Sequence, residues 1–166
     1  MELLALGAAG ALLIAAFIDV FFVTGIFFSG LFLLAMVGTL YTTGEIGLWE
    51  TIPFLWVGSW LGNLSNFFAG KQLTHLSVVR RTLANPRVAK LQERASGIHF
   101  VSFVGLVLIS RALGMVRPFY GLAFGAADIK TIRFVTAETI AVSIWVFSWI
   151  TLAHYSIGSV AHLFQS

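Results

Sequence analysis

Two arginines lie six residues apart inside an otherwise apolar stretch, at Arg111 and Arg117. Neither has an acidic residue within ten positions, so no local ion pair explains them. An arginine at bilayer depth costs about 2.5–3.5 kcal/mol on insertion scales, and such residues usually mark a function. A guanidinium binds carboxylate or phosphate through two parallel hydrogen bonds. The pair therefore predicts a site for an anion such as phosphate. The alternative is a loop between spans, with both arginines at the headgroups.

The composition places the chain among integral membrane proteins. Of its 166 residues, 58% are hydrophobic and 10% are charged, and the mean hydropathy is +0.93. A soluble domain is about 45–50% apolar and about 25% charged. The length predicts one domain, residues 1–166. The net charge of +3 is small and gives no reason to expect a nucleic-acid partner.

Enzymatic chemistry is not expected. The chain has no cysteine, which excludes disulfides and thiol catalysis. Its four histidines are scattered without the spacing of metal ligands, and no nucleophile stands beside a base. We therefore predict no metal, no cofactor and no catalytic residue.

The apolar segments predict an all-α membrane protein, built as an inverted repeat of a re-entrant hairpin followed by a transmembrane helix. A single crossing needs about 20 residues, so the first apolar stretch is too long for one span. Basic residues concentrate in one loop, which the positive-inside rule places in the cytoplasm, with both termini on the other side. The predicted segments are a first hairpin at 1–43, a span at 46–70, the cytoplasmic basic loop at 71–96, a second hairpin at 97–127 and a span at 134–163.

Interrupted apolar helices mark binding sites in many transporters. Glycine and proline are predicted to break the hairpins at Gly30, Gly114, Pro118, Gly121 and Gly125. Small and amide residues suit close helix packing in membranes. Packing positions are predicted at Gly62, Asn66, Gly70, Trp145 and Gly158. An interfacial aromatic belt is predicted at Trp49, Trp56 and Trp60.

Asp19 is the one charge within residues 3–43. An acid at depth is usually paired; the alternative is a turn acid at the interface. Shifting the sequence by 88 residues sets Glu50 on Glu138, as an inverted repeat would. Such a repeat would bring Asp19 to face Arg111 and Arg117 near the midplane. One carboxylate against two arginines would leave one guanidinium uncompensated and available to an anion.

With these residues in view, the chain resembles the DedA family, also called the VTT or SNARE-associated domain. Residues 110–125 and 129–134 are similar to the family's "GRF-x-P-x-x-R … AG … M-x-x-x-x-F" signature, including the step between the two arginines. Residues 62–71 are similar to its "GD-x-x-x-Y-x-x-GR", and Trp145 with residues 154–158 to its "W … GY-x-x-G".

The resemblance implies two re-entrant hairpins that meet within the membrane. It also implies a multi-pass protein of the inner (plasma) membrane that moves lipids between leaflets, with undecaprenyl phosphate or a phospholipid as substrate. Relatives are discussed as proton-coupled through two acids in the first hairpin. Asp19 matches the first acid, whereas Leu31 stands at the second. A homo-oligomer, such as a dimer, is one possible functional form of the protein.

The expected function is a flippase- or scramblase-like lipid translocase in which Arg111, Arg117 and Asp19 bind the phosphate-bearing substrate. Asp19 would be a counter-ion to the arginines, and transport would depend little on a proton gradient. The alternative is a small ion- or proton-coupled transporter involved in membrane or osmotic homeostasis. In that case Asp19 and His154 would carry protons.

Overall fold

The computed structural model describes residues 2–21, 24, 30–42, 44, 47, 49–75, 97–113, 116, 117 and 119–163. Every regular element within these residues is a helix, so the predicted all-α class is confirmed. The helices, in chain order, are α1 Glu2–Val20, α2 Gly30–Thr42, the short 3₁₀ helix η1 Trp49–Thr51, α3 Ile52–Leu73, α6 Phe100–Ala112, α7 Tyr120–Ala126 and α8 Thr131–Leu163.

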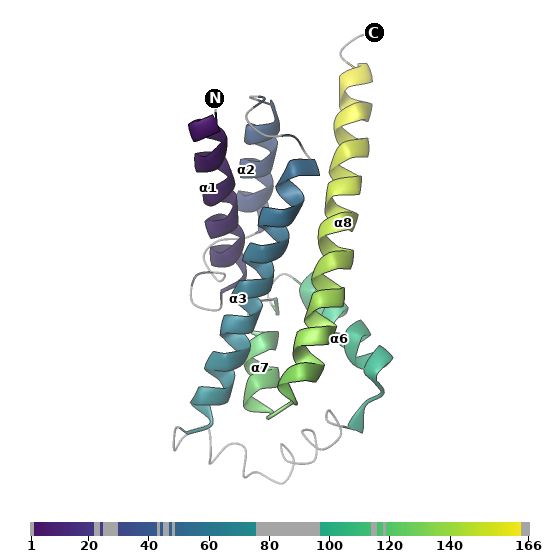
Figure 1. Cartoon of the computed structure of the whole chain (residues 1–166). Coiled ribbons are helices and arrows are strands. Elements are labelled where there is room, and N and C mark those ends of the chain that lie inside the picture. The colour runs from purple at the N-terminus through teal and green to yellow at the C-terminus, as the bar shows by residue number, and fades with distance from the viewer. Residues whose placement is uncertain are drawn as a thin grey trace.

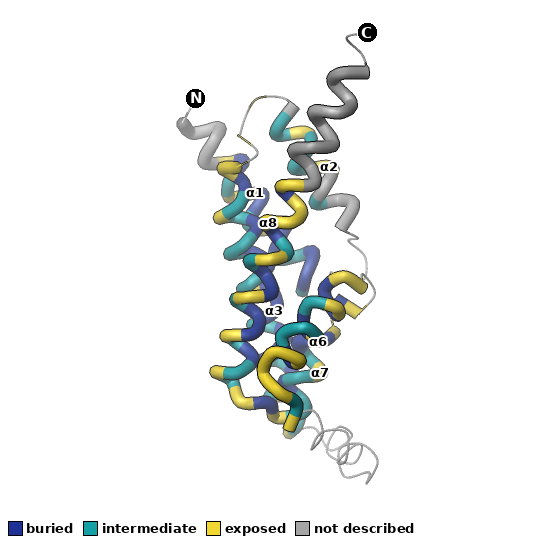
Figure 2. The backbone as a smooth tube through the Cα atoms, turned by 90° about the vertical axis from the view of Figure 1, so that its right-hand side faces the viewer, coloured by how far each residue is buried: buried dark blue, intermediate teal, exposed yellow. Residues whose placement is uncertain are grey.

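Helix α3 is the central element of the fold. Pro53 stands in its first turn, where the missing N–H costs nothing, and Lys71 lies in its last turn, where a cation complements the helix dipole. Its 22 residues make it about 33 Å long. It contacts α1, α7 and α8, and Figure 2 shows many buried positions along its course.

Two short helix pairs approach the middle of the molecule from opposite ends. Figure 1 shows α1 and α2 beside the upper part of α3, and α6 and α7 in the lower half. Helices α3 and α8 run along both halves, and the start of α1 lies at the same end as the end of α8. Each pair is interrupted at mid-height, where α1 ends at Val20 and α6 ends at Ala112.

The residues predicted to break the hairpins lie in different structural positions. Gly30 is the first residue of α2, next to the interruption. Gly121 and Gly125 do not break the chain, because both lie inside α7. A Cβ at Gly121 would lie 3.0 Å from the backbone oxygen of Asn63, so these glycines permit close approach of α7 to α3. Gly114 and Pro118 lie outside the described residues.

Two hydrophobic clusters form the core. The upper cluster joins α1, α3 and α8, and its buried members are Leu12, Ala16, Leu55, Val142, Val146 and Ile150. The lower cluster joins α3 with α6, α7 and α8, and its buried members are Phe67, Phe103, Val107, Tyr120, Ile129, Phe134, Ala137 and Ala141. Between them, α3 carries Asn63 and α8 carries Glu138, both completely buried. Polar side chains are thus buried where the two hydrophobic clusters meet.

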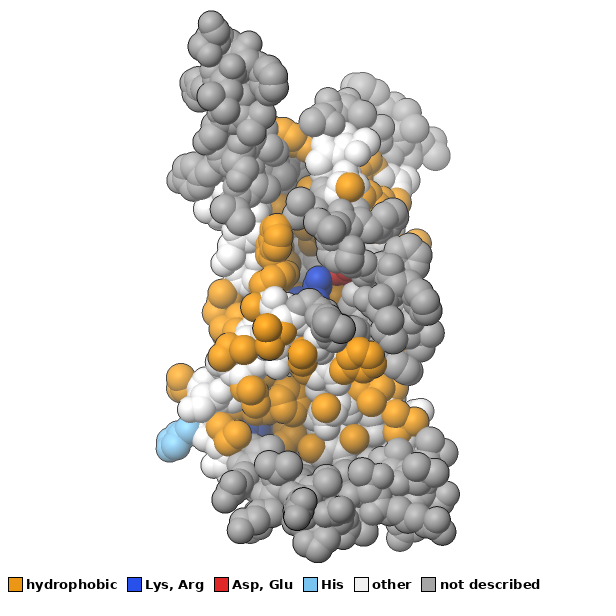
Figure 3. Space-filling model, turned by 180° about the vertical axis from the view of Figure 1, so that it is seen from behind, with side chains coloured by type: hydrophobic (Ala, Val, Ile, Leu, Met, Phe, Trp, Pro, Cys, Tyr) orange, Lys and Arg blue, Asp and Glu red, His pale blue; other side chains and the backbone are white. Residues whose placement is uncertain are grey.

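The outer surface is rich in large apolar side chains. Val101 of α6 is 79% exposed and Ile132 of α8 is 73% exposed, and Figure 3 shows hydrophobic side chains spread over the face seen there. Within the described residues, one helical stretch, Thr131–Thr151, is long and apolar enough to cross a membrane. The apolar stretches Gly7–Val20 and Phe100–Ala112 are shorter than one crossing requires. More than one crossing therefore stays a prediction.

Candidate functional site

Arg111 lies in the last turn of α6 with its side chain fully buried. Its Nη1 atom forms an ion pair with Oε1 of Glu138 on α8. The same nitrogen donates a hydrogen bond of 3.2 Å to the Tyr120 hydroxyl. A buried charge is tolerated only when it is paired and hydrogen-bonded. The contact therefore ties the end of α6 to α8.

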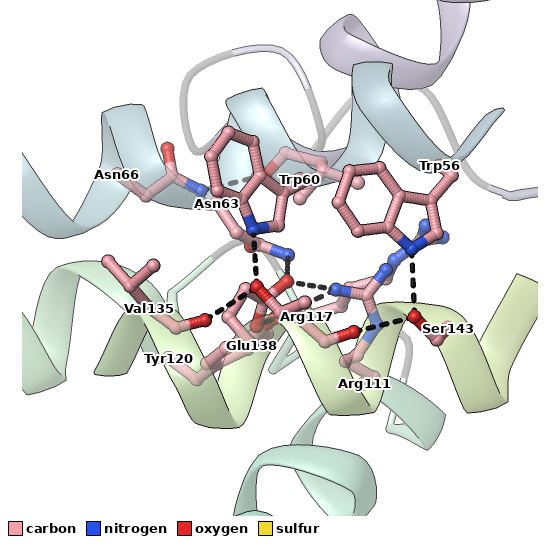
Figure 4. A network of polar contacts seen from close by, with 12 residues as sticks. Trp56, Trp60, Asn63, Asn66, Arg111, Arg117, Tyr120, Val135, Glu138 and Ser143 are labelled. Carbon is pink, nitrogen blue, oxygen red and sulfur yellow. Dashed lines mark hydrogen bonds and ion pairs between the residues drawn. The ribbon is translucent and has the colours of Figure 1, made fainter. Parts of the chain in front are cut away.

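Glu138 receives donors from three other elements. Asn63 of α3 donates its Nδ2 to Oε1 at 2.7 Å, and the Tyr120 hydroxyl at the start of α7 donates to Oε2 at 2.7 Å. With Arg111 of α6, both carboxylate oxygens are occupied. Figure 4 shows these side chains converging between α3 and α8. Because four helices meet at one carboxylate, its position is closely fixed.

Arg117 lies between α6 and α7 and pairs with the other half of the molecule. Its Nη1 atom is 2.6 Å from Oδ2 of Asp19, near the end of α1. Its guanidinium carbon is 5.7 Å from the centre of the Trp145 ring on α8, a cation–π arrangement. The Arg117 side chain is 10% exposed, whereas that of Arg111 is 0% exposed. The structure thus brings Asp19 to Arg117 and gives Arg111 a different partner.

The expectation that one arginine would remain uncompensated is wrong. Glu138 neutralises Arg111, so the cluster holds two guanidinium groups and two carboxylates and is formally neutral. Glu138 is 27 residues from Arg111, which put the pair beyond the reach of local sequence patterns. The available signal was that Glu138 is the single acid after Asp128. Its predicted counterpart in the first half, Glu50, is exposed and accepts a hydrogen bond from the Gly47 N–H at 3.0 Å.

Several polar atoms of the cluster have no hydrogen-bond partner within the described part of the chain. They are Nε and Nη2 of Arg111, Nε of Arg117, Oδ1 of Asn63 and Oδ2 of Asp19, all buried, and the last of them lies in the ion pair with Arg117. An unpartnered buried donor carries a desolvation cost of about 1–3 kcal/mol, and more when it is charged. The guanidinium donors match the oxygens of a phosphate or carboxylate. Among the described residues, no group of three His, Asp or Glu side chains could hold a metal ion.

The indole N–H groups of Trp56 and Trp60 face α8. Both are partly buried between α3 and α8, where Trp56 donates to the Ser143 hydroxyl at 2.9 Å and Trp60 to the Thr139 hydroxyl at 3.1 Å. A buried indole N–H needs an acceptor, and the α8 hydroxyls supply one. Trp49 is 53% exposed. The indoles continue the polar contacts of Asn63 along the seam between α3 and α8 (Figure 4).

The predicted packing residues lie mainly on α3. A Cβ at Gly62 would lie 3.0 Å from the Phe17 backbone oxygen of α1, and one at Gly70 would overlap the Leu122 backbone of α7. Asn66 donates to the Val20 backbone oxygen at 2.9 Å, so it satisfies a carbonyl at the end of α1. Gly158 lies within α8. Asn66 therefore helps to fix the end of α1 that carries Asp19.

The helical fold, the apolar exterior and the enclosed ion pairs are typical of a membrane protein. The family model of the VTT domain matches residues 19–155, a range that contains the whole cluster. The chain belongs to this family, the DedA family.

Among curated proteins, the chain is similar to the inner membrane protein YabI of Escherichia coli (strain K12), with 25% identity over 138 residues. The alignment covers 81% of this chain and 52% of YabI, so the chain spans about half the length of that relative. No solved structure matches the chain.

Proposed function

We propose that this protein is a membrane lipid translocase, flippase- or scramblase-like, that moves a phosphate-bearing lipid between leaflets. Undecaprenyl phosphate and phospholipids are the substrate classes. One observation carries the proposal: two buried guanidinium groups lie in one cluster with donors that no described residue accepts. Arg111 and Arg117 would bind the phosphate, and Asp19 would balance the charge while the site is empty.

The surroundings of the cluster favour a lipid over a small soluble anion. The face shown in Figure 3 carries a small patch of basic and acidic side chains at mid-height, and hydrophobic side chains lie beside it. A lipid can keep its acyl chains against such an apolar surface while its headgroup enters a polar site. Because Arg117 retains some exposure, it is the arginine that such a headgroup would meet first.

The arrangement of the helix pairs supports a transport role. Helices α1 and α2 approach the cluster from one end of the molecule, and α6 and α7 approach it from the other (Figure 1). We propose that these are two re-entrant hairpins of an inverted repeat in a multi-pass inner-membrane protein. The interrupted segments would then meet near the midplane, where transporters of this kind bind their substrates.

Reconstituted transport tests the proposal. Liposomes containing the purified chain would be loaded with fluorescent polyprenyl phosphate or phosphatidylglycerol, and an impermeant quencher would report movement to the outer leaflet. We expect Arg111→Ala and Arg117→Ala to abolish transport, and Lys to substitute poorly because it lacks the planar fork. Lys130→Ala, an exposed basic residue outside the cluster, is the matched control. Normal transport by both correctly inserted alanine variants would remove the basis of the proposal.

A small ion- or proton-coupled transporter is the second candidate. It is favoured by the two buried carboxylates, Asp19 and Glu138, each of which forms an ion pair with one of the two arginines. The same liposomes distinguish the two functions. Dissipation of an imposed pH gradient without any movement of labelled lipid would favour the second candidate over the first.

A further inference from the structure

The two arginines of the cluster are held in different ways. Arg111 is fully buried and contacts both Glu138 and Tyr120, and Glu138 is itself held by Asn63. Arg117 is also buried but its side chain keeps 10% exposure, and its ion pair within the described residues is with Asp19 alone. Displacing Glu138 would break contacts to three helices at once, whereas displacing Asp19 breaks one ion pair.

We infer that the arginines divide the binding of the phosphate: Arg111 is a fixed donor positioned by Glu138, and Arg117 exchanges Asp19 for the ligand. This inference rests on the proposed function. Asp19 is then an internal competitor that occupies the place of the phosphate in the empty protein. Glu138 is a positioning residue that acts through Arg111.

The unpartnered donors fit this division. Nη1 of Arg111 is engaged by Glu138 and Tyr120, which leaves Nε and Nη2 buried without acceptors in the described part of the chain. Nε of Arg117 is also without an acceptor among the described residues. A phosphate has enough oxygens to replace Asp19 at Arg117 and to accept from the free donors of Arg111. At Arg117 the phosphate takes the place of the Asp19 carboxylate, one anion for another. The ion pair between Arg111 and Glu138 stays intact.

Lipid binding by the full chain in detergent micelles tests the division. The probes are short-chain phosphatidic acid and the diacylglycerol of the same chain length, which differs by the phosphate. Tryptophan fluorescence reports binding, because the Trp145 ring lies 5.7 Å from the Arg117 guanidinium carbon. The part of the signal that Trp145→Phe removes is assigned to this site.

Opposite effects are expected for the two carboxylates. Asp19→Asn removes the competitor and should tighten binding of phosphatidic acid about tenfold, and Asp19→Ser gives the same test should the first variant not fold. Glu138→Gln frees Arg111 and should weaken binding about tenfold. The pair Asn63→Asp with Glu138→Gln moves the carboxylate across a 2.7 Å hydrogen bond and should restore affinity to within about threefold of wild type. Asp128→Asn, which removes an exposed carboxylate paired with Lys71, should change nothing.

The outcomes separate this inference from the function on which it rests. Tighter binding by Asp19→Asn together with rescue by the Asn63→Asp and Glu138→Gln pair supports the division. Shifts of the same sign in Asp19→Asn and Glu138→Gln, or a pair that folds without regaining affinity, would overturn it and leave the lipid site standing. A wild-type protein that binds phosphatidic acid no better than diacylglycerol would overturn both.

Discussion

Among the single residues of the cluster, Tyr120 contacts both members of the ion pair between Arg111 and Glu138. Its hydroxyl accepts from Arg111 and donates to Glu138, so one oxygen connects both members of an ion pair. Its ring belongs to the lower core, with a centroid 6.2 Å from that of Phe124. The polar and apolar parts of the side chain thus have separate tasks, which can be tested separately.

Tyr120→Phe keeps the ring and removes the hydroxyl. We expect the free energy of unfolding to fall by about 1 kcal/mol, since hydrogen bonds between membrane helices contribute about 0.6–2 kcal/mol each. Thermal unfolding of the purified protein in detergent measures the change. Tyr41→Phe, at a partly buried position of the upper core, is the control and should leave the midpoint nearly unchanged. Equal stability of Tyr120→Phe and wild type would show that the bridge contributes little.

The sequence allowed prediction of the charged residues better than of their pairing. Arg111, Arg117 and Asp19 are conspicuous because each is a charge in an apolar run. Their partners depend on which helices meet, and local patterns do not report this. Glu138 follows a segment with several charges and so stands out less, and Asn63 and Tyr120 carry no charge that would draw attention to them. A search for every acid within an apolar helix would have found Glu138.

At the scale of the helices, glycines allow the backbones of neighbouring helices to pack closely. Gly58 and Gly62 bring α3 against α1, and Gly70 with Gly121 and Gly125 brings it against α7. A Cβ at Gly58 would overlap the Leu13 backbone oxygen, and one at Gly125 would overlap that of Phe67. Backbone atoms of a helix cannot rotate away as a side chain can. These glycines therefore set the spacing at which the cluster residues of α3 and α7 reach Glu138.

Gly125→Ala should separate α7 from α3. We expect overpacking to cost about 1–3 kcal/mol and to reduce the amount of folded protein in the membrane. Gly105→Ala is the matched control, because it lies within α6 and a Cβ there would meet nothing within 4 Å. It should be neutral or stabilising by up to about 1 kcal/mol, since alanine is the better helix former. Comparable losses in both variants would refute the assignment of Gly125 to a close contact.

The elements themselves followed from hydropathy and length more closely than their roles did. The apolar segment at 46–70 overlaps the helix α3 at Ile52–Leu73, and the one at 134–163 overlaps the helix α8 at Thr131–Leu163. Gly121 and Gly125 were assigned to a break because glycine disfavours helices, yet in α7 the absence of a Cβ serves helix contact. Indoles such as Trp56 and Trp60 predict an interface, and in the fold hydroxyls of the facing helix α8 accept their N–H groups. Residue type alone singles out such glycines and tryptophans, but their role depends on the helix that packs against them.

At the scale of the whole molecule, the cluster joins the α1 and α2 pair to the α6 and α7 pair through the ion pair of Asp19 with Arg117. Asp19 comes from the α1 and α2 pair, and Arg111 and Arg117 come from the α6 and α7 pair. Asn63 and Glu138 come from the two helices that run along both halves (Figure 1). Any change in the relative position of the pairs must break or exchange an ion pair at their meeting point. Under the proposed function, an exchange of ion pairs at this point would couple ligand binding to movement of one pair against the other.

The transport proposal requires that α3 crosses the membrane, with its two ends on opposite sides. The basic loop at 71–96 predicts that the end of α3 is cytoplasmic and its start is on the other side. The chain has no cysteine, so single substitutions give clean labels. Gly47→Cys, before the start of α3, should react with an impermeant maleimide on intact cells, and His75→Cys, after its end, only once the membrane is permeabilised; both positions are exposed.

Leu61→Cys completes the test, because this exposed residue lies midway along α3 and should face lipid. It should resist the aqueous reagent in intact and permeabilised cells and react only in detergent or with a membrane-soluble maleimide. Labelling of His75→Cys but not Gly47→Cys from outside would reverse the orientation. Labelling of both from the same side would show that α3 does not cross, and rapid aqueous labelling of Leu61→Cys would place the middle of α3 in water. Either of the last two results would remove the midplane position on which the transport proposal depends.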